Sequence, residues 1–383
     1  MMPINKRLKR ELKKNFAKYF FIGLVLFMGI TIISAFFTAT DGIMSTIESQ
    51  QSDCNIEDAN VTLVSQLSDD NISRLHEIGI NDLEDTSYCD VTALDDSDYT
   101  MRVFRVRDSV DKLSLIEGEL PANDKQIVLE SKTASAKDLS VGDEIDVDGK
   151  NYTLSGIVAV VDYNNVLQTV SSGVSNLKTF GLGFVSKQAF DGLDSAKMTI
   201  QYSLTAEDEQ SIDDAYNYLM DEEIAVNILK QSDNPRIKSI SDKTNTLKAE
   251  VTLISVVFVL LMVFIFYAMT SASVEKDSNL IGTFFSMGYT RWEIIQHYVR
   301  LPLIITLIGS VLGMITGSLL FAEPIGKITY STYSLPAQQT YKYRLRFQYR
   351  LHLEAAYQTA DTLKTHGVMP SQYWQYCLNI IYW

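Results

Sequence analysis

The clearest chemical signal in this sequence comes from residues 275–300, where apolar side chains recur at the spacing of one helix face. Polar side chains such as Lys276, Asn279 and Thr283 fall mostly on the opposite face. An apolar helix face of this kind predicts non-covalent docking into a groove on a partner. A helix resting on the lipid surface would show the same spacing, so this alternative stays open. The apolar set consists of Leu280, Ile281, Phe284, Phe285 and Met287.

Two local signals predict where this helix ends and where the next one begins. Gly288 follows the apolar set, and glycine adopts the left-handed conformation that often terminates a helix. Thr290 and Glu293 then fit a capping box, in which hydroxyl and carboxylate each bind a free backbone N–H. The sequence therefore predicts a helix, a tight turn and a second helix.

Motifs for enzymatic chemistry are missing. There is no G-x-x-x-x-G-K-[ST] loop for ATP phosphates, no G-x-S-x-G nucleophile elbow and no H-E-x-x-H zinc helix. We therefore expect no catalytic residue in this chain, and no cofactor or metal. The histidines lack metal-ligand spacing and favour ordinary core or surface roles. They are His76, His297, His352 and His366.

Three charge-free apolar stretches are long enough to cross a bilayer as helices, which takes about 20 residues. They cover 19–40, 251–274 and 301–322, and the last two flank the connector at 275–300. Since none of them contains an ionisable residue, an ion or proton path through this chain alone is not expected.

The basic segment 1–18 predicts the orientation, because lysine and arginine prefer the cytosolic side of a membrane. We expect a cytosolic N-terminus, an extracytoplasmic domain at 41–246 and a cytosolic connector in a multi-pass protein of the cell membrane. A cleaved signal peptide is the alternative to an anchor at 19–40. Its apolar core is usually about 7–15 residues, so this longer stretch favours a retained helix.

The charge is divided sharply along the chain. Residues 1–40 hold seven basic residues and one acidic residue, and 247–383 hold ten basic and seven acidic residues. Because the whole chain carries −14, the domain at 41–246 carries −23. Such an acidic surface argues against a nucleic-acid partner and suits a solvated domain that is held off anionic lipid headgroups.

The domain at 41–246 has the pattern of a mixed α+β fold. Residues 144–154 alternate around Asp148-Gly149, which predicts a β-hairpin. An amphipathic helix is predicted at 206–219, in a second lobe whose boundary we place near 160–185. A polar helix is predicted at 238–247, leading into the second span. Cys54 and Cys89 share this domain and could pair, but their spacing does not decide it.

Gly309, Gly313 and Gly317 are each four residues apart in the third apolar stretch. On a helix they form one row, which lets another helix backbone approach closely. We therefore predict that this row packs against a neighbouring helix.

The segment 281–290, Ile-Gly-Thr-Phe-Phe-Ser-Met-Gly-Tyr-Thr, resembles the Ile-Gly-x-x-x-Ala-x-Gly motif of FtsX-like permeases, the membrane subunits of MacB-type ABC systems. The resemblance extends to the glycine row and to the order of span, large external domain, span, connector and span. Ser286 replaces the usual alanine, and Pro302 stands where many members carry an acidic residue.

This resemblance implies an ABC permease subunit that couples ATP hydrolysis on a separate ATPase to movement of the external domain, in export or mechanotransmission. It also implies a second permease chain or half as a partner in the bilayer. The alternative is a membrane-anchored sensor or binding module without an ATPase. The residues expected to contact the ATPase are Leu280, Ile281, Gly282, Thr283, Phe284, Phe285, Met287, Gly288 and Tyr289.

The tail at 323–383 changes character after Pro336, where tyrosine and glutamine become frequent. Three spans would place it outside the cell, yet it carries a basic cluster that the positive-inside rule disfavours there. Family members usually continue into a fourth span, so we expect a frameshift or truncation near 336; a genuine, poorly ordered tail is the alternative. The cluster consists of Lys342, Arg344, Arg346 and Arg350.

Overall fold

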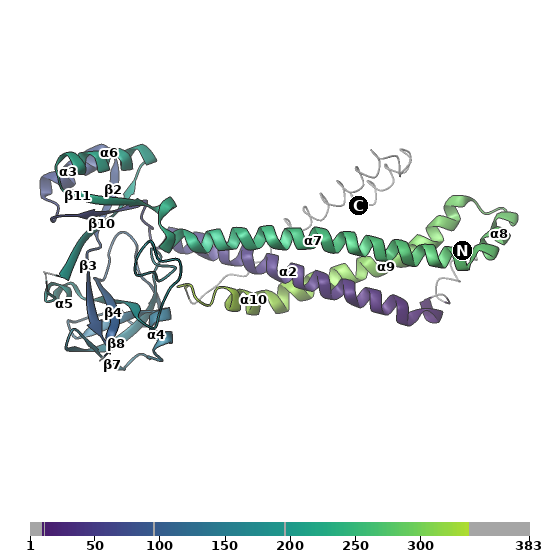
Figure 1. The fold of residues 1–383 in the computed structure, drawn as a ribbon, viewed down its shortest axis with the longest axis horizontal. Helices are drawn as coiled ribbons and strands as arrows, with labels where there is room; N and C mark the ends of the chain where they lie inside the picture. Colours follow the sequence, from purple (N-terminus) through teal and green to yellow (C-terminus); the bar gives the residue numbers. More distant parts are fainter. Residues whose placement is uncertain (1–9, 11, 95, 195–196, 337–383) are drawn as a thin grey trace. The chain divides into compact units, whose positions relative to one another are not determined.

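The computed structural model describes residues 10, 12–94, 96–194 and 197–336, which form two compact units (Figure 1). The helical unit contains the described residues up to Asp41 together with Leu247–Gly326. The sheet unit contains Gly42–Thr246 and the described residues from Lys327 onward. The sequence predictions about the tail after 336 lie outside the described residues.

Three helices of the helical unit are long and apolar enough to cross a membrane, as the sequence predicted. The first is α2 and the second is α7; the third begins as α9 and continues through the π-helix η3 into α10. The helix α8 lies between α7 and α9. The bounds are α2 Phe16–Asp53, α7 Pro235–Lys276, α8 Ser278–Ser286, α9 Arg291–Thr316, η3 Gly317–Phe321 and α10 Ala322–Thr329.

The sheet unit is a mixed α+β domain, and the fold class expected from the sequence is therefore confirmed. Its eleven strands are β1 Ala59–Leu63, β2 Ile80–Asp85, β3 Tyr88–Ala93, β4 Asp96–Arg105, β5 Ser114–Gly118, β6 Gln126–Glu130, β7 Glu144–Val147, β8 Lys150–Ala159, β9 Phe180–Val185, β10 Met198–Ala206 and β11 Ala225–Lys230. Its other elements are α3 Asp69–Ile78, α4 Ser131–Ala136, α5 Lys187–Asp191, α6 Glu209–Asp221 and the short η2 Gln231–Asp233.

The strands follow the order β11-β1-β10-β3-β4-β9-β6-β8-β5, with β2 beside β10 and β7 beside β3 and β8. The pairs β4–β9 and β6–β8 are parallel, and the others are antiparallel. Only two residue pairs join β10 to β3, so the sheet is narrowest there.

That narrow point separates two hydrophobic lobes. One core draws its buried residues from 59–80 and again from 204–219, on strands β1, β2 and β10 and helices α3 and α6. The other buried clusters draw theirs from 89–193. The first lobe is therefore formed by two separate parts of the chain, and the second lobe by the residues between them. Our sequence analysis instead placed a single boundary near 160–185. Strand order is non-local, so periodicity could not reveal this arrangement.

The predictions of individual elements in this domain had mixed outcomes. The hairpin is confirmed, since β7 and β8 pair and Asp148 and Gly149 both have positive φ. The helix predicted from residue 206 instead begins at Glu209, because Asp208 caps it by accepting from the Ser211 N–H at 2.8 Å. Cys54 and Cys89 are both buried and free.

Residues 330–335 fold back onto the sheet unit, although our sequence analysis placed them in the atypical tail. Ser334 is fully buried; its N–H donates to the Asn164 carbonyl at 2.7 Å, and its hydroxyl accepts from the Val160 N–H at 3.1 Å. Tyr330, 2% exposed, lies with its hydroxyl 2.9 Å from that of Thr244. This segment is therefore part of the domain core.

Candidate functional site

The connector helix α8 ends and α9 begins as their sequences dictate. Gly288 has φ +89°, the left-handed conformation that stops α8. The Thr290 hydroxyl accepts from the Glu293 N–H at 3.4 Å, and the Glu293 carboxylate accepts from the Thr290 N–H at 2.9 Å. The predicted turn and capping box are thus confirmed. The capping contacts also lower the pKa of Glu293.

The apolar residues of α8 divide into two groups. Leu280, Ile281 and Phe284 are half-buried against their own helical unit, whereas Phe285 and Met287 are 46% and 60% exposed. Tyr289 is half-buried because its ring contacts that of Phe284. The two rings meet edge to face, with their centroids 5.5 Å apart. The remaining expected contact residues are exposed; they are Gly282, Thr283 and Gly288.

The geometry therefore assigns different surroundings to neighbouring phenylalanines. Phe284 helps to hold α8 to the turn that follows it, and the Tyr289 N–H donates to the Phe284 carbonyl at 3.1 Å. At the other end of α8, the Tyr298 hydroxyl donates to the Asp277 carboxylate at 3.0 Å. Phe285 carries the apolar surface that is available to a partner. Helical spacing alone grouped the two residues together.

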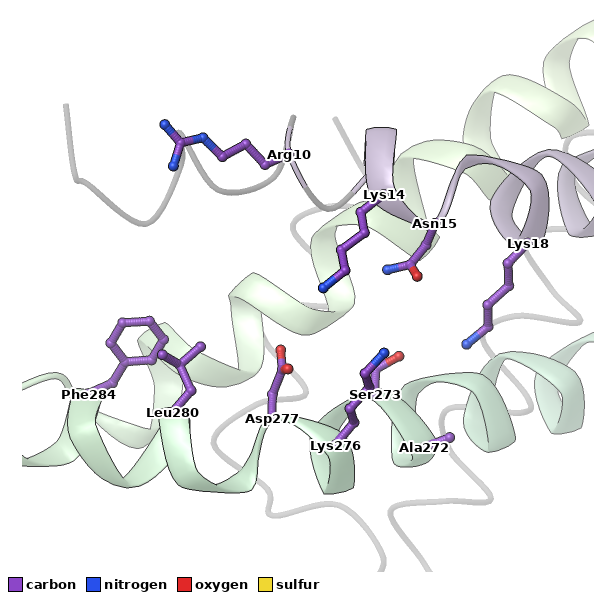
Figure 2. A pocket seen from close by; sticks show the side chains of 10 residues that line it. All are labelled: Arg10, Lys14, Asn15, Lys18, Ala272, Ser273, Lys276, Asp277, Leu280 and Phe284. Atoms are coloured by element: carbon purple, nitrogen blue, oxygen red, sulfur yellow. The ribbon is translucent and has the colours of Figure 1, made fainter.

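A pocket with a volume of about 640 Å³ lies beside α8 and was not foreseen from the sequence (Figure 2). Residues from the segment before α2 and from the start of α2 line one side of it, and residues from the end of α7 and from α8 line the opposite side. The signal that could have revealed it is the group of basic residues directly before the first apolar stretch, together with Lys276 directly after the second.

The glycine row packs against α2 of the same chain. A Cβ added at Gly313 would lie 2.8 Å from the Phe27 carbonyl oxygen, and one at Gly309 would lie 2.8 Å from the Leu26 side chain. A Cβ at Gly317 would collide with the Thr31 carbonyl oxygen. The row thus lets the third span and α2 approach backbone to backbone.

A hydroxyl cluster continues this contact, and sequence reasoning missed it because single serines and threonines carry no spacing signal. The Ser34 hydroxyl lies 2.8 Å from that of Ser318 on η3, and the Thr38 hydroxyl donates to Ser318 at 2.9 Å. These bonds satisfy polar groups within an apolar helix pair. Between α2 and α7, Asp41 and Lys248 form an ion pair at 2.7 Å.

In the sheet unit, the residues that follow α2 and precede α7 meet on one buried carboxylate. Glu57, 1% exposed, accepts from the Asn234 side-chain amide at 3.3 Å and from the Ser203 hydroxyl at 2.6 Å. Pro235, the residue after Asn234, begins α7. The Glu57 carboxylate therefore connects the segment after the end of α2 with the segment before the start of α7 and with strand β10.

Further charges lie buried around Glu57. Arg107 donates to Asp162 at 2.6 Å, and Asp111 accepts from the Glu57 N–H at 2.9 Å. One guanidinium thus faces three carboxyl groups. Burial, together with the neighbouring carboxylates, raises the pKa of Glu57 and raises the pKa of Asp111 well above its ordinary value. Within the described residues, no three His, Cys, Asp or Glu side chains are placed to share a metal ion.

Three solved structures show slight similarity to this chain. The extracellular domain of the noncanonic ABC-type transporter YknZ from Gram-positive bacteria is 12% identical, with a TM-score of 0.29, and the match covers 44% of this chain and 100% of that chain. A domain of a permease-like protein from Porphyromonas gingivalis is 12% identical, with a TM-score of 0.26 and coverage of 43% and 84%. A lipoprotein-like protein from Bacillus anthracis is 11% identical, with a TM-score of 0.24 and coverage of 45% and 96%. No conclusion rests on scores this low.

No curated protein matched the sequence. The family model described as FtsX-like permease C-terminal matches residues 252–344, which include most of α7, the connector α8 and the glycine row on the third span. This match agrees with the resemblance found in the connector motif. Residues 252–344 therefore belong to the FtsX-like permease family, whose members are membrane permeases.

Proposed function

We propose that this chain is the permease subunit of an ABC transporter and that α8 receives the motion of an ATPase on a separate polypeptide. The observation that carries the proposal is the exposure of Phe285 and Met287 on a short helix between two apolar spans. A soluble partner would bury both side chains in an apolar groove, which is a common way to bind an amphipathic helix. ATP hydrolysis then takes place on the partner.

The path of the motion follows from the packing. Displacing α8 moves the turn at Gly288 and the start of α9, because Phe284 and Tyr298 connect α8 to the residues beyond it. The glycine row couples α9 to α2 with little room for sliding. Both α2 and α7 contribute residues to the sheet unit, where Glu57 binds the segments at their ends. The sheet unit then moves in export or in mechanical signalling across the membrane.

The orientation belongs to the same proposal. The basic start of the chain and α8 face the cytosol of a cell-membrane protein, and the acidic sheet unit lies on the other side. A second permease chain or half completes the transporter in the bilayer. An ATPase that works on the cytosolic side reaches α8 in this arrangement.

Affinity purification from the native host tests the ATPase partner. We expect an ABC ATPase to co-purify with the tagged chain and to be lost from Phe285→Asp, because an unpaired carboxylate in an apolar groove is costly to desolvate. Asn279→Asp adds the same charge to the same helix at an exposed position outside the expected contact set and should retain the ATPase. If Phe285→Asp retains the ATPase as well as the unmodified chain does, α8 does not dock through this face. If no ATPase co-purifies with the unmodified chain, a membrane-anchored sensor or binding module accounts for the chain better.

A further inference from the structure

The pocket beside α8 is strongly basic. Arg10 and Lys14 come from the segment before α2, Lys18 from the start of α2 and Lys276 from the end of α7 (Figure 2). Among the described residues, Asp277 is the one acidic side chain in its lining, and the Tyr298 hydroxyl donates to it. Within the described part of the chain, none of the four basic side chains forms an ion pair. The pocket therefore presents an excess of unneutralised positive charge.

This charge lies where two spans leave the apolar part of the molecule. Lys18 directly precedes the apolar stretch 19–40, and Lys276 comes two residues after the stretch 251–274. In a bilayer these positions are at the level of the lipid headgroups. The pocket is thus placed at the depth where phosphate groups are found.

One face of α2 changes from basic to apolar as it leaves the pocket. Lys18, Phe21 and Val25 follow one another on α2 at i, i+3 and i+7, so they share a stripe, and Lys14 lies just before the helix begins. Phe21 is 64% exposed. The same face therefore offers basic side chains to a lipid headgroup and, next to them, apolar side chains to an acyl chain.

We propose that this pocket binds an anionic phospholipid, with its phosphate among Lys14, Lys18 and Lys276 and one acyl chain along Phe21. Ammonium groups bind phosphate oxygens through charge-assisted hydrogen bonds. The amphiphilic stripe favours a lipid over a soluble anion, because a soluble anion would gain nothing from Phe21. This proposal goes beyond the proposed function and stands on different residues from the ATPase contact.

The bound lipid links α2 to the connector. Leu280 and Phe284 of α8 line the same pocket as the lysines, and in Figure 2 their side chains project toward the start of α2. Occupancy by a lipid therefore restricts the position of α8 relative to α2. The lipid composition of the membrane would then set how readily the connector moves.

Native mass spectrometry of the full chain in mild detergent tests the proposal without a bilayer surface or an ATPase. The probes are dioleoyl-phosphatidylglycerol and dioleoyl-phosphatidylcholine, which share acyl chains and differ in net charge. We expect phosphatidylglycerol to stay bound preferentially, and K14Q/K18Q/K276Q to weaken it about 100-fold, at about fivefold per lysine. K112Q/K125Q/K187Q removes the same charge at exposed positions of the sheet unit and should leave binding unchanged.

Three results would overturn the assignment. Equal binding of phosphatidylglycerol by K14Q/K18Q/K276Q and the control variant would show that the pocket is not the lipid site. Full displacement by millimolar glycerol phosphate would show that a free anion, not a lipid, is the ligand. Loss of ATPase co-purification in K14Q/K18Q/K276Q with unchanged lipid binding would assign the pocket to the protein partner. If that variant is not recovered folded, a photoactivatable phosphatidylglycerol can be cross-linked to the unmodified chain. Labelled peptides that contain Lys14 and Lys276 would support the assignment, and labelled peptides without them would overturn it.

Discussion

The hydroxyl oxygens of Ser34 and Ser318 lie 2.8 Å apart and join α2 to the π-helix η3 within the helical unit. The Ser34 hydroxyl is also 3.2 Å from the Met314 carbonyl oxygen. At the neighbouring Gly317, a side chain would collide with the Thr31 carbonyl oxygen of α2. A π-helical turn at the end of a span is uncommon and is often found at functional positions. Here it places Ser318 against Ser34 and Thr38 of α2.

Gly313→Leu should destabilise the helical unit by about 1–3 kcal/mol, because its side chain would overlap the Phe27 carbonyl and Ile30. Thermal unfolding of the full chain in mild detergent measures the effect. The matched control is Gly282→Leu, since a Cβ at Gly282 meets nothing within 4 Å. Equal melting temperatures for the two variants would show that the close packing against α2 contributes nothing to stability.

Ser318→Ala should cost about 0.6–1.7 kcal/mol, the range found for hydrogen bonds between membrane helices. The change leaves Thr38 without its acceptor and removes the hydroxyl contact of Ser34 with Ser318. Ser310→Ala is the control on the same span, because its half-buried hydroxyl has no hydrogen-bond partner among the described residues. The same unfolding assay applies. A smaller loss for Ser318→Ala than for Ser310→Ala would contradict the role of the hydroxyl cluster.

The sequence was informative where structure depends on neighbours along the chain. The turn at Gly288, the Thr290–Glu293 capping box and the hairpin at Asp148 and Gly149 all depend on a few consecutive residues, and all three are present. The three apolar helices followed in the same way from length and composition.

Features that depend on distant parts of the chain were not predictable in this way. Glu57 lies far in sequence from Asn234 and Arg107, and only the strand order brings these three side chains together. Helical spacing could not show that Phe284 would turn inward to Tyr289 while Phe285 stayed exposed. The basic pocket likewise needs the start of α2 to lie beside the end of α7.

Cysteine labelling of intact cells tests the orientation. In a background with Cys54, Cys89 and Cys377 replaced by alanine, Asp124→Cys should react with a membrane-impermeant maleimide. Ser278→Cys should react only after the cells are opened, because α8 faces the cytosol in the proposed topology. Both positions are exposed, so burial in the chain does not shield either of them. The reverse pattern would place α8 outside the cell and exclude a cytosolic ATPase partner for it.

The buried charge cluster predicts that the sheet unit becomes less stable as the pH rises. Asp111 and Glu57 both have pKa values raised above those of the unfolded chain. Burial is the chief cause for both, Asp162 adds to both shifts and Glu57 adds to that of Asp111, although Arg107 opposes them. A carboxyl group of this kind contributes its full stability below its unfolded pKa of about 4 and loses it as the pH rises toward its folded value. Asp111→Asn keeps an oxygen for the Glu57 N–H and removes one ionisation. The variant should therefore be more stable than the wild type at pH 7–8 and no more stable near pH 4.

Thiol labelling under native conditions provides the readout, since Cys54 is buried beside this cluster and its carbonyl accepts from the Lys112 N–H at 2.9 Å. With Cys377 replaced by serine in both proteins, the ratio of wild-type to variant labelling at Cys54 should rise with pH. Comparing the two proteins at each pH removes the change in thiol reactivity itself. Cys89, buried in a core of the same sheet unit, should show the same trend wherever its labelling requires that the unit unfolds. A Cys54 ratio that stays constant between pH 5 and pH 8 would show that Asp111 is ionised at no cost in the folded domain, contrary to its burial among like charges.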